Sequence, residues 1–287
     1  MTVRSVPPCP APFRARLRLG LAAACVLLAA AAPVTEAPAV PEALAVPGGV
    51  APGRKALPPP GVGLRPVVEC PPAPLAPIPL PHTAATLAAN KPLVVVAVGS
   101  SSTEGWLASD VAHSYPAVLQ AALNLAFPRA DFAVINRGIG GQDASEELAR
   151  LDTDVIAVRP QLVIWQVGAN GALRDTDPAV FRRLVTAGLA KLRAAGADVV
   201  LMDNQRTARM VAAPENNKID QALAGVAAEN GVPLFARSAL MDAWGRDGHA
   251  MTEFTASDGL HMNDSGYRCV AQALAESITL GLDEKSP

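Results

Sequence analysis

The amino-acid sequence predicts an α/β fold in which a parallel five-stranded sheet lies between layers of helices. The first observation is a continuous β-branched run at residues 93–98, which is typical of a strand buried on both faces. The second is that four further strand-like runs follow it, separated by segments whose apolar residues recur at three- and four-residue spacing. This alternation indicates βαβ units in a doubly wound sheet.

The later strands are predicted at residues 131–135, 162–167, 198–202 and 231–236. Pro233 marks the last run as a strand start or an edge strand, because proline has no N–H to donate to a ladder. One helix is predicted over 117–127, after Pro116, which suits a first helical turn. Another is predicted over 181–192, with leucines on one face.

Residues 1–32 have the pattern of a signal peptide. Four arginines and no acidic residue lie in the first 18 residues, and residues 19–32 are apolar or small. Fourteen such residues are short for a membrane span. We therefore expect export to the periplasm or the outside of the cell, with an uncleaved anchor as the alternative.

Residues 33–87 are rich in proline and alanine, and 15 of the 27 prolines lie between residues 33 and 81. This composition predicts a disordered linker, followed by one folded domain over 88–287. Without residues 1–32 the net charge falls from −2 to about −6. No basic run remains, so we expect neither a nucleic-acid partner nor a membrane partner beyond the signal segment.

Four polar or glycine-rich blocks follow the predicted strands or close the domain. Gly99 to Thr103 follows the first strand, Asn136 to Gly141 the second, and Gly168 to Asn170 the third, while residues 257–261 read Ser-Asp-Gly-Leu-His. Because the carboxyl ends of parallel strands meet at one edge of a sheet, the first three blocks are expected to lie together. With the last block they supply a hydroxyl, an imidazole and a carboxylate, the minimum set for serine ester hydrolysis.

In this order the blocks resemble those of the SGNH hydrolases, also called GDSL-type esterases. The resemblance covers residues 91–287 and implies a three-layer, flavodoxin-like α/β/α fold and a carboxylic ester hydrolase. It implies that Ser101 is the nucleophile, His261 the base and Asp258 its partner. It also implies an oxyanion hole made by the Ser101 and Gly141 N–H groups and the Asn170 side chain.

Two positions depart from the family's pattern. Ser100 stands where an aspartate is usual, and Gly171 follows Asn170 where an aspartate is commonest, which leaves the local support of Asn170 open. The α/β-hydrolase elbow, Gly-x-Ser-x-Gly, is a competing pattern, but Thr103 occupies its last position here.

The other polar residues are weaker candidates than this set. His249 is the only rival base, and His82 and His113 are interpreted as having no carboxylate at a useful spacing. Glu104 and Trp106 follow Ser101 closely enough to line its pocket, although a helix cap and a core residue are equally good interpretations. No cluster has metal-ligand spacing, and no glycine-rich loop has a P-loop ending, so we expect neither a metal nor an organic cofactor.

Cys70 and Cys269 remain after the signal peptide. An exported protein can join two such cysteines in a disulfide. Alternatively, Cys269 is a buried small residue and Cys70 a free thiol. Both interpretations stay open.

The expected substrate is a small-molecule ester or an O-acyl group on a glycan, by analogy with the family. Two other functions stay open: an O-acyltransferase that uses the same site, and a non-catalytic envelope protein that binds glycans on the same scaffold. Turnover of short-chain aryl esters separates the last of these from the others.

Overall fold

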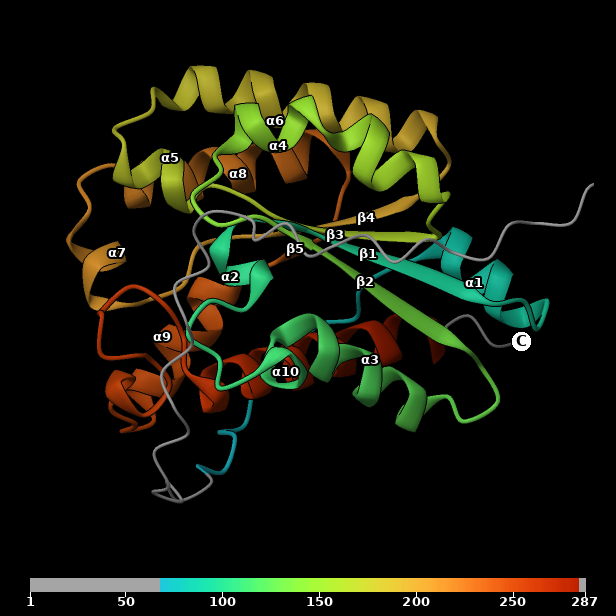
Figure 1. The fold of residues 1–287 in the computed structure, drawn as a ribbon, viewed down its shortest axis with the longest axis horizontal. Helices are drawn as coiled ribbons and strands as arrows, with labels where there is room; N and C mark the ends of the chain where they lie inside the picture. Colours follow the sequence, from blue (N-terminus) through green and yellow to red (C-terminus); the bar gives the residue numbers. More distant parts are fainter. Residues whose placement is uncertain (1–67, 284–287) are drawn as a thin grey trace, which may run out of the picture. The chain divides into compact units, whose positions relative to one another are not determined.

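The computed structural model describes residues 68–283. The predicted signal peptide at 1–32 and the first part of the predicted linker, 33–67, lie outside the described residues. Within residues 68–283, strands and helices alternate from β1 onward (Figure 1).

The five strands are β1 (Leu93–Gly99), β2 (Phe132–Gly138), β3 (Leu162–Gln166), β4 (Asp198–Met202) and β5 (Leu234–Phe235). The helices of eight or more residues are α1 (Pro81–Ala88), α3 (Tyr115–Ala126), α6 (Pro178–Ala194), α8 (Asn216–Asn230), α9 (Arg237–Arg246) and α10 (Asp264–Asp283). Shorter helices are α2 (Ser101–Glu104), α4 (Ala144–Ala149), α5 (Ala169–Leu173) and α7 (Ala208–Ala212). Single helical turns lie at Val111–His113, Leu151–Val155, Ile156–Val158 and Met251–Glu253.

The strands form one sheet in the order β2-β1-β3-β4-β5, and every neighbouring pair is parallel. This confirms the predicted fold class. The interior strand β1 has a neighbour on each side and a helix layer on each face, which explains why its sequence is apolar at consecutive positions. The edge strand β5 has only two residues, because Pro233 directly before it cannot donate to the ladder.

Helices cover both faces of the sheet (Figure 1). α3 and α10 lie on one face, where Val95 and Ala97 of β1 join their core. α4, α6 and α8 lie on the other, where Val96 and Val98 join a second core. Alternate residues of one strand therefore serve two cores, as the period of two along a strand requires.

Most predicted elements differ from the observed ones only at their ends. β2 continues past residue 135 to Gly138, because its polar residues Asn136 and Arg137 still pair with Ala97 and Val98 of β1. α6 begins at Pro178, three residues earlier than predicted, because the Asp177 carboxylate accepts the N–H groups of Ala179 and Val180.

The predicted linker over 33–87 is corrected for residues 68–87, which belong to the folded domain. Ile78 and Leu80 are buried in the core beside α10 and α3. The Ile78 N–H donates to the Ser277 carbonyl at 3.0 Å, and a Cβ at Gly281 would collide with the Ile78 carbonyl. Proline excludes central strand and helix interior, but it permits an extended segment that packs by apolar contact.

The α1 helix also lies within that predicted linker. Pro81 occupies its first turn, where a missing N–H has no intrahelical partner to lose. The Asp198 carboxylate, at the start of β4, accepts the Thr83 N–H and hydroxyl, both at 2.8 Å. A cap supplied from 115 residues away is a tertiary contact, so local sequence did not reveal this helix.

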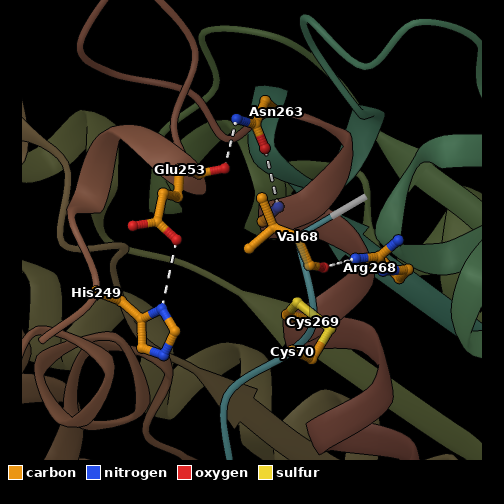
Figure 2. The surroundings of a disulfide bond; sticks show 8 residues. Val68, Cys70, His249, Glu253, Asn263, Arg268 and Cys269 are labelled. Carbon is orange, nitrogen blue, oxygen red and sulfur yellow. Dashed lines mark hydrogen bonds and ion pairs between the residues drawn. A yellow bond between two sulfur atoms is a disulfide. The ribbon is translucent and has the colours of Figure 1, made fainter. Parts of the chain in front are cut away.

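The structure contains the Cys70–Cys269 disulfide, one of the two interpretations left open by the sequence (Figure 2). The bond joins residue 70 to α10 across 199 positions of the chain. Arg268, next to Cys269, also donates to the Val68 carbonyl (Figure 2). These two contacts hold the start of the described chain against α10.

No helix among residues 68–283 is long and apolar enough to cross a membrane.

We predict that Cys70→Ser lowers the free energy of unfolding by about 2–5 kcal/mol, because the disulfide restricts a long loop in the unfolded chain. Denaturant unfolding of the oxidised protein measures this difference. Reducing the wild-type protein should produce the same loss. Equal midpoints for variant and wild type would contradict the prediction.

Candidate active site

Ser101 begins α2 directly after β1, and the end of β3 holds this turn in place. The Gln166 side-chain oxygen accepts the Ser100 N–H at 3.1 Å and the Thr103 hydroxyl at 3.1 Å. Ser100, which replaces the family's aspartate, is therefore tied to the sheet through its own backbone. A Cβ at Gly138 would collide with the backbone of Glu104, so glycine at the end of β2 lets α2 pack closely.

Asp258 and His261 lie in the loop before α10, where the aspartate folds back onto the histidine. One Asp258 oxygen accepts the N–H groups of Leu260 and His261, each at 3.0 Å. The other lies 2.6 Å from the His261 Nδ1. Gly259 completes the turn with a φ of +69°, a conformation that favours glycine.

The His261 imidazole also reaches Ser101. Its Nε2 lies 2.9 Å from the Ser101 Oγ, although the two residues are 160 positions apart. A carboxylate at Nδ1 favours the tautomer with its proton on that nitrogen, which leaves the Nε2 lone pair directed at the hydroxyl. The structure therefore brings all three predicted catalytic side chains into one hydrogen-bonded chain.

Two opposing effects act on the Asp258 carboxyl. Burial raises its pKa, but the backbone N–H groups of His261 and Leu260 and the His261 ring outweigh burial, so that the pKa lies below its ordinary value. Asp258 is consequently ionised at neutral pH. An ionised carboxylate at Nδ1 stabilises positive charge on the imidazole.

Gly141 lies on the loop that follows β2, and Asn170 lies in the first turn of α5, which follows β3 at the same edge of the sheet. A Cβ built at Gly140 would lie 3.8 Å from the Ser101 Cβ, which places this glycine loop beside the serine. The Asn170 side-chain N–H₂ donates to the Gln142 carbonyl at 2.8 Å. This leaves one of its two hydrogens for another acceptor.

The support of Asn170, left open by Gly171, comes from this neighbouring loop. Arg174, one turn after Asn170, donates to the Gly141 carbonyl at 2.7 Å and to the Asp143 carboxylate at 3.1 Å. The bonds from Asn170 and Arg174 to the carbonyls of residues 142 and 141 hold the loop after β2 against α5. An aspartate after Asn170 is therefore not needed to join these two segments.

Trp106 lies next to the histidine and is partly exposed to solvent. Its exposed fraction is 48%, and its ring centroid lies 6.3 Å from that of His261. The backbone is held on both sides: the Trp106 N–H donates to the Ser101 carbonyl, and the Tyr267 hydroxyl donates to the Trp106 carbonyl. The interpretation of Trp106 as a core residue is therefore wrong.

The competing histidines lie elsewhere. His249 pairs with Glu253 at 3.3 Å (Figure 2). The expectation that His113 has no useful carboxylate is wrong, because Asp110 lies 2.9 Å from its Nδ1. However, the Ser109 hydroxyl contacts that same nitrogen at 3.1 Å, whereas base catalysis needs the carboxylate and the hydroxyl on opposite nitrogens.

Several buried polar residues behind the site were missed in the sequence. Arg237 is fully buried and bonds to the Ser102 hydroxyl, and the Asp203 carboxylate accepts the Ser238 N–H. Asp203 directly follows β4, and one residue, Ala236, separates Arg237 from the end of β5. The strand-end rule that selected the first three blocks would have selected these residues too, had it been applied to the last two strands.

Burial raises the pKa of Asp203 to about 6, an effect that hydrogen bonds from Ser238 only partly oppose and that the charge of Asp220 reinforces. Burial also raises the pKa of Glu147 well above its ordinary value, although its carboxylate accepts the Trp165 indole N–H at 2.8 Å. Perturbed carboxyls of this kind gather near functional sites.

Taken together, the parallel sheet and the hydroxyl–imidazole–carboxylate chain at its carboxyl edge define an α/β protein with a serine-centred site. The model of the non-GDSL lipase-like family matches residues 68–284. The chain belongs to this family. The resemblance to SGNH hydrolases predicted from the four blocks is confirmed.

Among curated proteins, the chain is 31% identical to the esterase TesA of Pseudomonas aeruginosa over 112 residues, which is 39% of this chain and 50% of TesA. It is 33% identical to an arylesterase of Vibrio mimicus over 120 residues, which is 42% of this chain and 57% of the arylesterase. The matched part thus spans about half the length of these relatives.

Solved structures share the fold. A two-domain esterase active on acetylated mannans has a TM-score of 0.62 and 22% identity, over 74% of this chain and 56% of that one. The crystal structure of TesA has a TM-score of 0.54 and 25% identity, over 64% of this chain and 97% of TesA.

We predict that Asp203→Asn changes how stability depends on pH. The folded pKa of Asp203 is about 6, above its unfolded value of 3.8, so the wild type has its full stability below the unfolded pKa and loses part of it as the pH rises through 6. The loss is on the order of 2–3 kcal/mol.

The free energy of unfolding of the variant and of the wild type is measured by denaturant unfolding at pH 4 and at pH 7. The change in their difference between the two pH values gives this loss. A difference that does not change between these two pH values would contradict the raised pKa.

Proposed function

We propose that the protein is a carboxylic ester hydrolase that acts through an acyl-enzyme on Ser101. The observation that carries this proposal is the His261 ring, which contacts Asp258 at Nδ1 and Ser101 at Nε2. Such two-sided bonding allows the ring to accept the serine proton while its positive charge is stabilised. The family and the curated esterase relatives support the same chemistry.

In the first half of the reaction, the Ser101 Oγ attacks the ester carbonyl carbon as its proton moves to the His261 Nε2. The carbonyl electron pair moves to oxygen, and the resulting oxyanion accepts hydrogen bonds from the Ser101 and Gly141 N–H groups and the Asn170 side chain. His261 then gives its proton to the departing alcohol oxygen as the ester C–O bond breaks.

In the second half, His261 removes a proton from water, whose oxygen attacks the acyl carbon. Collapse of this second oxyanion breaks the bond to the Ser101 Oγ, which recovers its proton from the ring. The products are a carboxylic acid and the enzyme in its starting state. Asp258 stays ionised and stabilises the imidazolium in both halves.

For the substrate we infer an O-acyl group on a glycan or another short-chain ester. Trp106 offers a half-exposed aromatic face beside His261, and aromatic faces provide apolar contact area for a ligand ring. The solved esterase active on acetylated mannans, which shares the fold, supports the glycan. Residues 1–32 and the Cys70–Cys269 disulfide support an exported protein, since disulfides persist in oxidising compartments.

The test is an ester assay with aryl acetates, butyrates and octanoates and with acetylated mannan and xylan oligosaccharides. We expect turnover of the acetyl substrates. Acyl transfer to an added glycan at a rate above hydrolysis would instead indicate a transferase. Glycan binding without turnover of any ester would overturn the proposal in favour of a binding protein.

We predict that Ser101→Ala abolishes ester turnover, whereas Ser100→Ala keeps most of it, because only the Ser101 hydroxyl contacts His261. His261→Ala should be nearly as damaging, and His249→Ala should have a mild effect. Initial rates on an aryl acetate measure all four variants. An active Ser101→Ala protein would place the nucleophile elsewhere.

We predict that Asn170→Ala lowers kcat by about 10²–10³-fold with little change in KM, as is typical when one oxyanion donor is removed. Steady-state kinetics on the same ester separate the two constants. A change confined to KM would indicate that Asn170 only binds the substrate.

A further inference from the structure

Arg237 is a buried charge that the proposed mechanism does not use. Its side chain is fully buried at the start of α9. A guanidinium removed from water destabilises the fold unless its donors are bonded. The destinations of these donors therefore indicate what the residue supports.

All of the Arg237 hydrogen bonds reach segments at the carboxyl edge of the sheet. Nη1 donates to the Ser102 Oγ at 2.8 Å, and Ser102 is the residue after the proposed nucleophile. Nε and Nη2 donate to the Asp203 carbonyl at 3.1 and 2.8 Å. Nη2 also donates to the Gln205 side-chain oxygen at 2.8 Å.

Gln205 carries this connection to the other half of the site. Its Nε2 donates to the Leu260 carbonyl at 2.9 Å, and Leu260 is the residue before His261. Gln205 has an exposed fraction of only 2%. Three hydrogen bonds thus run from Ser102 through Arg237 and Gln205 to Leu260, of which the first two are buried and the last is partly buried.

The two ends of this chain flank the bond on which the proposed reaction depends. The Ser101 Oγ and the His261 Nε2 lie 2.9 Å apart. Ser101 begins α2 and His261 lies in the loop before α10, and these two segments are 160 residues apart along the chain. A displacement of about 1 Å between reacting groups can cost on the order of 10²-fold in rate. A planar guanidinium with bonds in fixed directions is suited to limit such a displacement.

We propose that Arg237 and Gln205 are positioning residues that hold Ser101 at bonding distance from His261. This inference rests on the proposed function. Neither residue touches the reacting atoms, so their effect passes through Ser102 and Leu260. Removing the connection should therefore slow the chemical step and leave substrate binding unchanged.

The closest alternative is a purely structural role, in which the buried bonds only stabilise the fold. Such a role would lower the melting temperature and the fraction of competent enzyme. It would not change kcat for each competent site. An aryl phosphonate that labels the nucleophilic serine counts those sites, and its labelling rate reports the serine–histidine geometry without an ester substrate.

The main variant is Gln205→Met, which keeps the approximate side-chain volume but removes both the acceptor for Arg237 and the donor to Leu260. Gln120→Met is the matched control. The Gln120 side-chain oxygen also bonds to the backbone, because it accepts the Val134 N–H at 2.8 Å. Val134, however, lies in the middle of β2, away from the site.

We expect Gln205→Met to lower kcat per labelled site and the labelling rate about 10-fold, with KM within about twofold of wild type. Gln120→Met should keep both rates within about twofold of the wild-type rates, even if its melting temperature falls as far as that of Gln205→Met. Wild-type rates in Gln205→Met, or an equal loss in Gln120→Met, would overturn the positioning role.

A second variant keeps the test decisive if Gln205→Met does not fold. Ser102→Ala removes only the acceptor at the other end of the chain and places a good helix former in α2. We expect a loss of kcat per labelled site of about threefold or more. When both variants fold, the loss in the double variant should be smaller than the product of the single losses, because both act through Arg237.

A fully multiplicative double variant, or wild-type kcat in Ser102→Ala, would also overturn the inference. Failure of the proposed function gives a different result. In that case the wild type itself would neither turn over esters nor react with the phosphonate, and the positioning role would fall with it. Turnover by the wild type with no effect of Gln205→Met overturns the positioning role alone.

Discussion

The parallel pairing of β1 with β2 and β3 is the constraint on which the site depends. Parallel strands share a direction, so their carboxyl ends meet at one edge, and the loops that leave them are neighbours. Gly99 pairs with Gly138, which places the Ser101 turn beside the loop that contains Gly141. β3 ends at Gln166, whose side chain then bonds to the turn before Ser101.

The helix α10 joins that edge to the rest of the domain. It begins at Asp264, three residues after His261, and runs along one face of the sheet, where Cys269 bonds to Cys70 (Figures 1 and 2). The segment from residue 68 to α1 therefore packs against the helix that follows the proposed base.

Charged groups buried behind the site oppose stability, and their arrangement favours precise geometry. Glu147, Asp203 and Arg237 are each buried, and burial disfavours the charged form of every one of them. Each is nevertheless bonded, to Trp165, to Ser238, and to Ser102 with Gln205 respectively. Such bonded groups favour one arrangement of the surrounding segments, which the proposed acyl-transfer reaction requires.

Much of the sheet and the main candidates for the site can be predicted from local sequence patterns. The interior strands β1, β3 and β4 are buried on both faces, and such strands leave a local mark, the unbroken apolar run. All five strands were predicted, with errors only at their ends. The Asp258–His261 contact is local as well, because three residues of turn bring carboxylate and ring together. Ser101, Gly141 and Asn170 were assigned through the resemblance to the SGNH hydrolases, and their positions after predicted strand ends supported that assignment.

The contacts between segments distant along the chain could not be predicted in this way, because they depend on the three-dimensional packing. The folded part begins by residue 68 rather than 88, because the apolar residues of the proline-rich segment pack on α10, and Asp198 of β4 caps α1. The bond between Cys70 and Cys269 and the connection from Ser102 through Arg237 to Leu260 also join segments without a shared sequence pattern. A local pattern records what one segment buries, whereas the partner it meets depends on how all the strands and helices pack in space.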